Sequence, residues 1–299
     1  MSVRAELVRL GLRWLLKPQN HPGVTITRRR HRIANFERWV PPPPPGTKIS
    51  EEGLGGIPAM RVATPASMPE RHILFLHGGG YVTGRPELYR HVLWRFADAA
   101  RSRLAAIRYR LAPEYPFPAA LDDAVAAWRG LLVEGVTPER MAVMGDSAGG
   151  GLALALALRL RDEGLPLPSA VVAMSPWTDL ALTGQSLHRN RSADPMLNAE
   201  DVPHLAARYL NGADPRHPYI SPLYGDPTGL PPTLIQVGSD EILRDDAVRM
   251  AERMREAGCA IELEIWRRMP HVFQSFANVM PEARRAVARI GLFVRQHAG

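Results

Sequence analysis

Short apolar runs alternate with long helical patterns through most of this 299-residue chain. The apolar runs are nearly continuous, which is typical of strands that are covered on both faces of a sheet. Because parallel strands need a crossover connection, usually a helix, the repeated alternation predicts an α/β fold with a mainly parallel, doubly wound sheet. The expected strands are residues 72–77, 104–109, 141–145, 170–174, 233–237 and 261–266. The expected helices are residues 87–101, 119–133, 148–163, 243–257 and 282–297.

Two proline-rich segments divide the chain. Five consecutive prolines at 41–45 lack backbone donors and fix φ, so they predict a stiff linker rather than a helix or an interior strand. Residues 1–45 are therefore expected to be a separate segment, and residues 46–299 the main body. Within that body, prolines interrupt the strand–helix rhythm over residues 175–230, and a helical pattern near 199–210 predicts an insertion at the strand ends.

The positive charge of the chain is confined to its N-terminal segment. The sequence has 37 Lys and Arg residues against 30 Asp and Glu residues, and the surplus of seven falls within residues 1–40. Taken alone, this segment would fit a nucleic-acid binder or a protein that binds anionic membranes. Val3, Leu7, Leu10 and Trp14 lie there at helical spacing among arginines, which predicts an amphipathic helix.

The remaining composition excludes several classes of protein. A hydrophobic fraction of 45% with 22% charged residues is typical of a globular protein. The longest apolar run, residues 148–158, is shorter than the roughly 20 residues that a membrane-spanning helix needs. The N-terminus lacks the apolar core of a signal peptide, and the single cysteine, Cys259, excludes an internal disulfide and a cysteine-rich metal site. We therefore expect a cytoplasmic protein with no membrane span.

The pentapeptide Gly-Asp-Ser-Ala-Gly at 145–149 joins an expected strand to an expected helix. This is the context of the G-x-S-x-G nucleophile elbow, in which a strained turn exposes a serine hydroxyl. The glycines leave room for the turn, and the N-terminus of the following helix favours developing negative charge. The bare pattern also fits a strand-to-helix turn with a capping serine, but its position favours Ser147 as a nucleophile.

Three consecutive glycines follow an earlier expected strand. Gly78, Gly79 and Gly80 allow backbone N–H groups to approach a ligand closely. Together with the amide of Ala148, which follows the nucleophile, they predict an oxyanion hole. A phosphate cradle is the alternative, but it would need the glycines to open a helix beside a lysine, and the sequence has neither feature there. His77 is expected to form structural hydrogen bonds in this loop.

A nucleophilic serine needs a general base, and the base needs an acid to orient it. His271 follows the last expected strand, so the chain order serine, acid, histidine matches that of α/β hydrolases. The acid is expected after the preceding strand, where four carboxylates compete. Asp245 and Asp246 fit the first turn of a helix, where they offset its dipole. Asp240 and Glu241 both remain candidates on this reasoning.

These motifs, in this order, resemble those of the hormone-sensitive-lipase-like microbial esterases, family IV of the α/β hydrolases. The family's acid motif is usually Asp-Pro-Leu-x-Asp, and alignment on Leu243 and Asp245 puts its first position at Glu241. The resemblance therefore favours Glu241 as the acid, with Asp240 as the alternate. It covers nearly the whole body and includes, besides the elbow and the glycine loop, residues 109–114 (YRLAPE), 116–120 (PFPAA), 194–197 (DPML) and 229–233 (GLPPT).

The resemblance also implies an architecture and an activity. The implied fold is that of an α/β hydrolase with a helical cap, formed by residues 1–45 and an insertion at about 180–220. The implied activity is that of a serine carboxylesterase acting on small-molecule esters with short to medium acyl chains. The implied machinery is a triad of Ser147, His271 and Glu241 that forms an acyl-enzyme, and no metal, organic cofactor or nucleic acid is implied.

Further expectations concern the pocket, the cap and the partners. Tyr81 and Trp177 are candidate pocket walls, although core packing explains either residue equally well. In the cap, we expect the arginines to form the solvated face and the apolar stripe to close on substrate. A homodimer through the edge strand at 261–266 is implied by the family resemblance. A non-catalytic receptor with the same fold is a rival, and the presence of both Ser147 and His271 argues against it.

Overall fold

The computed structural model describes residues 1–37 and 40–299, so Arg38 and Trp39 of the expected N-terminal cap segment lie outside the described residues. Over the described residues, eight strands form one sheet in the order β1-β2-β4-β3-β5-β6-β7-β8. The strands are β1 (Lys48–Glu51), β2 (Ala59–Ala63), β3 (Met68–Leu76), β4 (Ser102–Ile107), β5 (Met141–Asp146), β6 (Ala170–Met174), β7 (Thr233–Gly238) and β8 (Ile261–Trp266).

The sheet is parallel from β4 through β3, β5, β6 and β7 to β8. At its other edge, β1 pairs with β2 and β2 pairs with β4 in antiparallel fashion. The expected strands all form, so the prediction of a mainly parallel, doubly wound α/β sheet is confirmed. Strands β1 and β2 were not predicted, and no residue of β1 is buried, so it lacks the apolar run that signals a strand.

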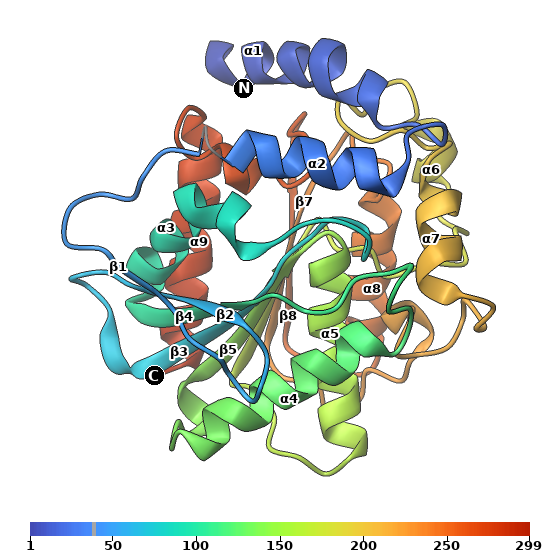
Figure 1. The fold of residues 1–299 in the computed structure, drawn as a ribbon. Coiled ribbons are helices and arrows are strands. Elements are labelled where there is room, and N and C mark those ends of the chain that lie inside the picture. Colours follow the sequence, from blue (N-terminus) through green and yellow to red (C-terminus); the bar gives the residue numbers. More distant parts are fainter. Residues whose placement is uncertain (38–39) are drawn as a thin grey trace.

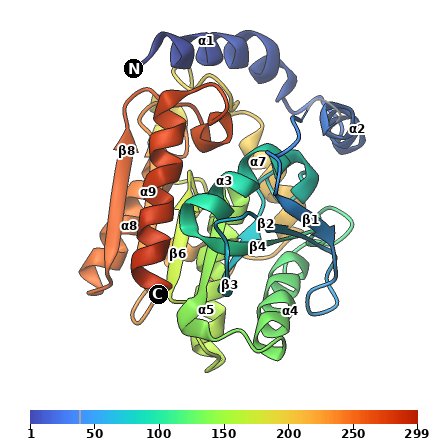
Figure 2. The same ribbon diagram turned by 90° about the vertical axis from the view of Figure 1, so that its left-hand side faces the viewer.

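Helices cover both faces of the sheet (Figures 1 and 2). Helices α3 and α9 pack on one face, and α4, α5 and α8 pack on the other. The described helices are α1 (Val3–Gly11), α2 (Ile26–Glu37), α3 (Arg90–Ala100), α4 (Ala119–Val133), α5 (Ala148–Asp162), α6 (Ser186–Arg189), α7 (Val202–Leu210), α8 (Arg244–Glu256) and α9 (Pro281–His297).

Strand β3 shows why helices pack on both faces. Ile73 and Phe75 belong to the core beneath α3 and α9, whereas Leu74 and Leu76 belong to the core beneath α4 and α5. Successive side chains of a strand point to opposite faces, so a continuous apolar run needs cover on both. All four side chains are fully buried, and each such burial contributes about 1.5–3 kcal/mol.

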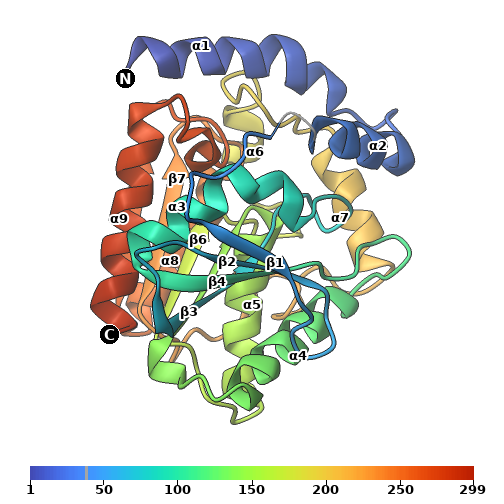
Figure 3. The same ribbon diagram turned by 60° about the vertical axis from the view of Figure 1, so that its left-hand side comes forward.

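Helices α1, α2 and α7 gather beyond the ends of the parallel strands (Figures 1 and 3). The Arg29 guanidinium of α2 donates to both carboxylate oxygens of Asp201, at 2.6 and 2.7 Å, directly before α7. Both residues are buried, so this bidentate pair fixes the N-terminal segment to the insertion. The two segments expected to form a cap are therefore joined to each other.

The orientation predicted for the N-terminal helix is wrong. Leu7 and Trp14 expose 62% and 72% of their surface, whereas Arg9 exposes 6%. Arg9 points toward the body, where Nη1 donates to the carbonyl oxygen of Arg268 at 2.8 Å and Nη2 pairs with Asp240 at 3.0 Å. The rim beneath α1 offers carboxylates and carbonyl oxygens, and a guanidinium satisfies these groups where an apolar side chain would leave them unpaired.

Candidate active site

Ser147 lies at the turn between β5 and α5, with φ of 54° and ψ of −122°. A positive φ is strained for a residue with a side chain, and here the turn directs the serine away from the packed elements on either side. The flanking glycines are sterically required. A Cβ at Gly149 would lie 2.0 Å from the carbonyl oxygen of Leu76, and one at Gly145 would lie 2.1 Å from that of Gly149. Ser147 is partly exposed, while its neighbours in the motif are buried.

Three side chains from separate loops form a continuous hydrogen-bonded relay. His271, in the loop after β8, places Nε2 2.9 Å from Ser147 Oγ. Its Nδ1 lies 2.7 Å from Glu241 Oε2, in the loop after β7. With Nδ1–H donating to the carboxylate, Nε2 is free to accept the serine proton. His271 is 2% exposed and Glu241 is 0% exposed, so water does not compete for these bonds.

The structure distinguishes between the two candidate acids. Glu241 faces His271, and its second carboxylate oxygen accepts hydrogen bonds from the Ser175 hydroxyl at 2.7 Å and from the Gly238 N–H. Asp240 points the other way and pairs with Arg9 of the N-terminal helix. The carboxylate that contacts the imidazole is therefore that of Glu241.

The charges around the relay favour a protonated imidazole. Burial lowers the pKa of His271, but the hydrogen bond and the negative charge of Glu241 outweigh this effect, and the net shift is upward. Asp194 and Asp146 add to the upward shift. Burial raises the pKa of Glu241, against the opposing hydrogen bond to His271. An imidazole held in this way becomes a better base for the serine proton.

The hydrogen bonds of the glycine loop reduce the number of N–H groups that can form the oxyanion hole. The Gly78 N–H donates to Asp146 Oδ1 at 3.0 Å and to the Tyr89 hydroxyl oxygen at 3.1 Å, so it is already engaged. Within the described part of the chain, the N–H groups of Gly79, Gly80 and Ala148 have no acceptor. The inclusion of Gly78 among the expected donors is therefore corrected, and the available donors are the other three amides.

Asp146 and Tyr89 are functional neighbours that sequence reasoning missed. The Tyr89 hydroxyl donates to Asp146 Oδ2 at 2.9 Å, and together they hold the start of the glycine loop against the elbow. Burial raises the pKa of Asp146 to about 6, although its hydrogen bonds from Tyr89 and Gly78 oppose that rise. A signal for Asp146 was present, since it occupies the variable position directly before the nucleophile. Tyr89, in the turn that precedes α3, has no comparable signal.

Ser175 was also missed. It follows β6 with φ of 46° and is fully buried. Its hydroxyl donates to Glu241 and accepts the N–H of Val272, the residue after His271, at 3.1 Å. Ser175 therefore ties the acid loop to the base loop.

His77 has the structural role that was expected of it. Its Nδ1 lies 2.8 Å from the carbonyl oxygen of Gly78, and its ring stacks on Tyr109 at 4.2 Å. Burial lowers the pKa of His77 to about 4, so it is neutral at physiological pH. It contacts none of the three relay side chains through a hydrogen bond among the described residues.

The two expected pocket residues belong to an aromatic cluster behind the elbow. Tyr81 stacks on Tyr209 of α7 at 3.7 Å, and its ring centre lies 6.2 Å from that of Trp177. Tyr81 and Trp177 expose 1% and 3% of their surface. The backbone N–H of Trp177 donates to the carbonyl oxygen of Ser147 at 2.9 Å. The cluster thus supports the nucleophile turn from behind, and the role of these residues as pocket walls stays a prediction.

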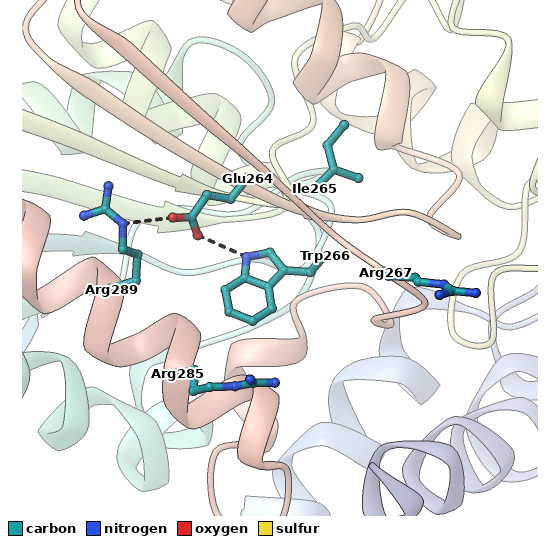
Figure 4. Close-up of a pocket in the computed structure, with 6 residues that line it drawn as sticks. All are labelled: Glu264, Ile265, Trp266, Arg267, Arg285 and Arg289. Carbon is teal, nitrogen blue, oxygen red and sulfur yellow. Dashed lines mark hydrogen bonds and ion pairs between the residues drawn. The ribbon is translucent and has the colours of Figure 1, made fainter. Parts of the chain in front are cut away.

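A hollow lined by residues of the edge strand β8 and of helix α9 is separate from this site (Figure 4). Glu264 accepts hydrogen bonds from Arg289 at 2.9 Å and from the Trp266 indole at 3.1 Å. The hollow contains none of the relay residues. Its lining residues are Glu264, Ile265, Trp266, Arg267, Arg285 and Arg289.

The described residues contain neither a cluster that could bind a metal nor a membrane-spanning helix. No group of three or more His, Cys, Asp or Glu side chains in residues 1–37 and 40–299 is arranged to hold a metal ion. Over the same residues, each helix is too short or too polar to cross a bilayer.

Comparison with known proteins agrees with the fold. Residues 73–275 match a protein family described as having an alpha/beta hydrolase fold. An acetyl-hydrolase of Streptomyces hygroscopicus is 48% identical over 79% of each protein. The putative acetyl-hydrolase LipR of Mycobacterium tuberculosis is 36% identical over 99% of this chain and 96% of its own length.

Solved structures extend the likeness to the whole chain. A crystal structure of an esterase from the bacterial hormone-sensitive lipase family superimposes with a TM-score of 0.94 at 42% identity, covering 100% of this chain and 99% of that one. The esterase EstE5, soaked with p-nitrophenyl butyrate, gives a TM-score of 0.94 at 38% identity with the same coverage. This chain therefore belongs to the α/β-hydrolase family and, within it, to the hormone-sensitive-lipase-like esterases.

Proposed function

We propose that this carboxylic ester hydrolase cleaves short- to medium-chain acyl esters through an acyl-enzyme intermediate on Ser147. The observation that carries the proposal is the relay from Ser147 Oγ to His271 Nε2 at 2.9 Å, and from His271 Nδ1 to Glu241 Oε2 at 2.7 Å. The base lies within hydrogen-bond reach of both the nucleophile and the orienting acid, which is the geometric requirement for this chemistry.

Acylation begins when Ser147 Oγ attacks the ester carbonyl carbon and His271 Nε2 takes the hydroxyl proton. The Glu241 carboxylate stabilises the imidazolium that forms and keeps the proton on Nδ1 in the correct position. His271 then donates its Nε2 proton to the leaving alcohol as the ester bond breaks. In deacylation, a water molecule attacks the acyl carbon while His271 takes its proton. His271 then returns the proton to Ser147 Oγ as the carboxylic acid leaves.

Backbone amides stabilise the oxyanion formed in each half-reaction. The available donors are the N–H groups of Gly79, Gly80 and Ala148, the last at the N-terminus of α5. Loss of a single donor of this kind costs about 10²–10³ in rate, so the loop contributes a large part of the catalysis. Asp146 and Tyr89 fix the loop without contacting the substrate.

The proposed cap consists of residues 1–45 and about 180–220. Its support is the buried Arg29–Asp201 pair between the two segments, and the position of Leu205 of α7 over the glycine loop. A Cβ at Gly80 would lie 3.1 Å from Leu205 Cδ1, so the cap packs directly on the oxyanion loop. The substrate class follows from the names of the relatives, two of which are acetyl-hydrolases, and from the aromatic cluster that fills the space behind Ser147.

The test is a chain-length series of p-nitrophenyl esters, from acetate to dodecanoate, on wild type and Ser147→Ala. Ser169→Ala is the matched control, because Ser169 directly precedes β6, whereas Ser147 lies beyond the other end of the neighbouring strand β5. The Ser169 hydroxyl donates to the backbone carbonyl oxygen of Met141. We expect turnover of the shorter esters by wild type and the control, and none by Ser147→Ala. Turnover retained in folded Ser147→Ala would refute the role of the serine, and a preference for dodecanoate would refute the substrate class.

Two further parts of the proposal concern the protein's surroundings. A homodimer through β8 is supported by the exposed edge of that strand, where Ile265 exposes 42% of its surface. A cytoplasmic location is supported by the single, unpaired Cys259. Sedimentation of the purified protein tests the first, and fractionation of the producing cell tests the second.

A further inference from the structure

The outer face of the N-terminal helix carries an uninterrupted apolar stripe. Val3, Leu7 and Leu10 lie on α1, and Trp14 lies in the π-helical turn Leu12–Leu16 that continues it. Their spacings of four, three and four residues place them along one side of the helix. They expose 78%, 62%, 44% and 72% of their surface, and the adjoining Leu15 exposes 71%. We call Val3, Leu7, Leu10 and Trp14 the α1 stripe. Helix α1 lies at the outside of the molecule, away from the sheet (Figures 1 and 2).

The α1 stripe is exceptional within this protein. Among the described residues, six of the eleven large apolar side chains that are well exposed belong to residues 1–15. Elsewhere such residues occur singly or far apart, as is normal on a protein surface. A contiguous patch of this kind marks a surface that contacts something other than water.

The charges beside the stripe identify the chemistry of its partner. Arg4 is exposed and has no carboxylate partner among the described residues. Arg13 and Lys17 donate to backbone carbonyl oxygens in residues 191–194, and neither forms an ion pair with a carboxylate among the described residues. Glu6, the acidic residue of this helix, already pairs with Arg9 and Arg268. The stripe is therefore flanked by net positive charge.

We propose that the α1 stripe docks on an anionic lipid–water interface. An amphipathic helix with Trp and Leu on one face and basic residues beside it is suited to lie in the plane of such an interface. A second copy of this chain fits less well, because a symmetric contact through the stripe would bring the cationic Arg4, Arg13 and Lys17 of both copies together. Substrate capping does not explain the stripe either, since its side chains are exposed to solvent.

The attachment of α1 gives docking a consequence for the active site. Arg9 ties the helix to Asp240 and to the carbonyl of Arg268, in the two loops that carry Glu241 and His271. Docking would therefore hold the catalytic loops in a fixed orientation to the lipid, with the cap side of the molecule toward it. That this orientation would serve the hydrolysis of esters dissolved in lipid rests on the proposed function, whereas docking itself does not.

Vesicle flotation of the full-length protein tests the proposal without any turnover. Vesicles of phosphatidylcholine with about 30 mol% phosphatidylglycerol are compared with pure phosphatidylcholine, at low and high salt. We expect wild type to bind the anionic vesicles, with binding that weakens as salt rises. Leu7→Glu/Leu10→Glu should lower the bound fraction at least about tenfold, because charge replaces apolar surface at the interface.

The matched control is Val133→Glu/Leu292→Glu, which makes the same change of charge at two exposed apolar residues of α4 and α9. It should bind like wild type. Circular dichroism and thermal unfolding establish that both variants fold, and Trp14→Ala serves as a milder second variant that should also weaken binding. Absence of wild-type binding, or equal binding by stripe and control variants, would overturn the proposal. So would a dimer in lipid-free solution that Leu7→Glu/Leu10→Glu dissociates, since the stripe would then be covered by a second copy.

Discussion

Replacing Glu241 by glutamine tests the relay with the smallest change of shape. The glutamine oxygen can keep the hydrogen bonds from Ser175 and Gly238, so the loop is expected to retain its conformation. The new NH₂ group would occupy the position of Oε2, 2.7 Å from His271 Nδ1. Because that group can only donate, Nδ1 must accept, and the proton of a neutral imidazole moves to Nε2. The nitrogen that faces Ser147 then has no free lone pair for the serine proton.

The size of the loss follows from this exchange of tautomers. The corresponding Asp-to-Asn change in a Ser-His-Asp triad lowers kcat by about 10⁴, and we expect a loss of about 10³–10⁴ for Glu241→Gln. Asp240→Asn removes an ion pair to Arg9 at 3.0 Å but leaves the imidazole untouched. It should cost about 1 kcal/mol of stability and change kcat by less than about threefold.

The assay is steady-state hydrolysis of p-nitrophenyl acetate by wild type, Glu241→Gln and Asp240→Asn, with circular dichroism to establish folding. KM should change little in both variants, because neither carboxylate contacts the substrate in the proposed mechanism. The reasoning would be refuted if folded Asp240→Asn lost most of its activity while Glu241→Gln kept it. The acid would then be the residue that the geometry turns toward Arg9.

Four further predictions concern the residues that support the site and one control glycine. Ser175→Ala should lower kcat about tenfold with little change in KM, because Glu241 loses a hydrogen bond; an unchanged kcat would contradict this. The raised pKa of Asp146, about 6, means that the folded protein binds its proton more tightly than the unfolded chain does. The contribution of Asp146 to the free energy of unfolding therefore falls as pH rises from about 4 to 6. In urea unfolding, Asp146→Asn should reduce the slope of the free energy of unfolding against pH in this range by up to about 1.4 kcal/mol per pH unit. Gly149→Ala places a Cβ 2.0 Å from a backbone oxygen of β3 and should cost about 3 kcal/mol in the same assay. Gly11→Ala, which meets nothing within 4 Å in a helix, should stabilise the protein slightly.

The elements that could be predicted are those whose signal is local. Each parallel strand is a short apolar run, and each covering helix has apolar residues at helical spacing. Both patterns can be recognised within one short stretch of the sequence. The pattern of the elbow is equally local, because its five residues are consecutive between a strand and a helix, although Gly149 is required by the carbonyl oxygen of Leu76 on β3. Ser147 and the glycine loop could therefore be located from the order of residues alone. β1 escaped prediction because its residues are not buried.

The contacts of the site that could not be predicted depend on how the loops run in the folded protein. Asp240 and Glu241 are neighbours with the same chemistry, and only the path of the loop after β7 decides which one faces His271. The engagement of the Gly78 N–H depends on the Asp146 carboxylate, 68 residues away in the chain. Ser175 connects the acid and base loops through a single hydroxyl, and one serine after a strand carries no pattern that would reveal such a contact.

The N-terminal helix shows why the usual rule for amphipathic helices fails at a polar rim. The rule places apolar residues inward because a protein interior is normally apolar. Beneath α1, however, the body presents the Asp240 carboxylate and the carbonyl oxygens of Arg268 and residues 191–194. Long cationic side chains satisfy these groups, so the cations turn inward and the apolar row is left outside. An arrangement with polar contacts to the protein and apolar contacts outward is favourable when the outer medium is itself apolar, which is the physical ground for expecting lipid rather than water against this helix.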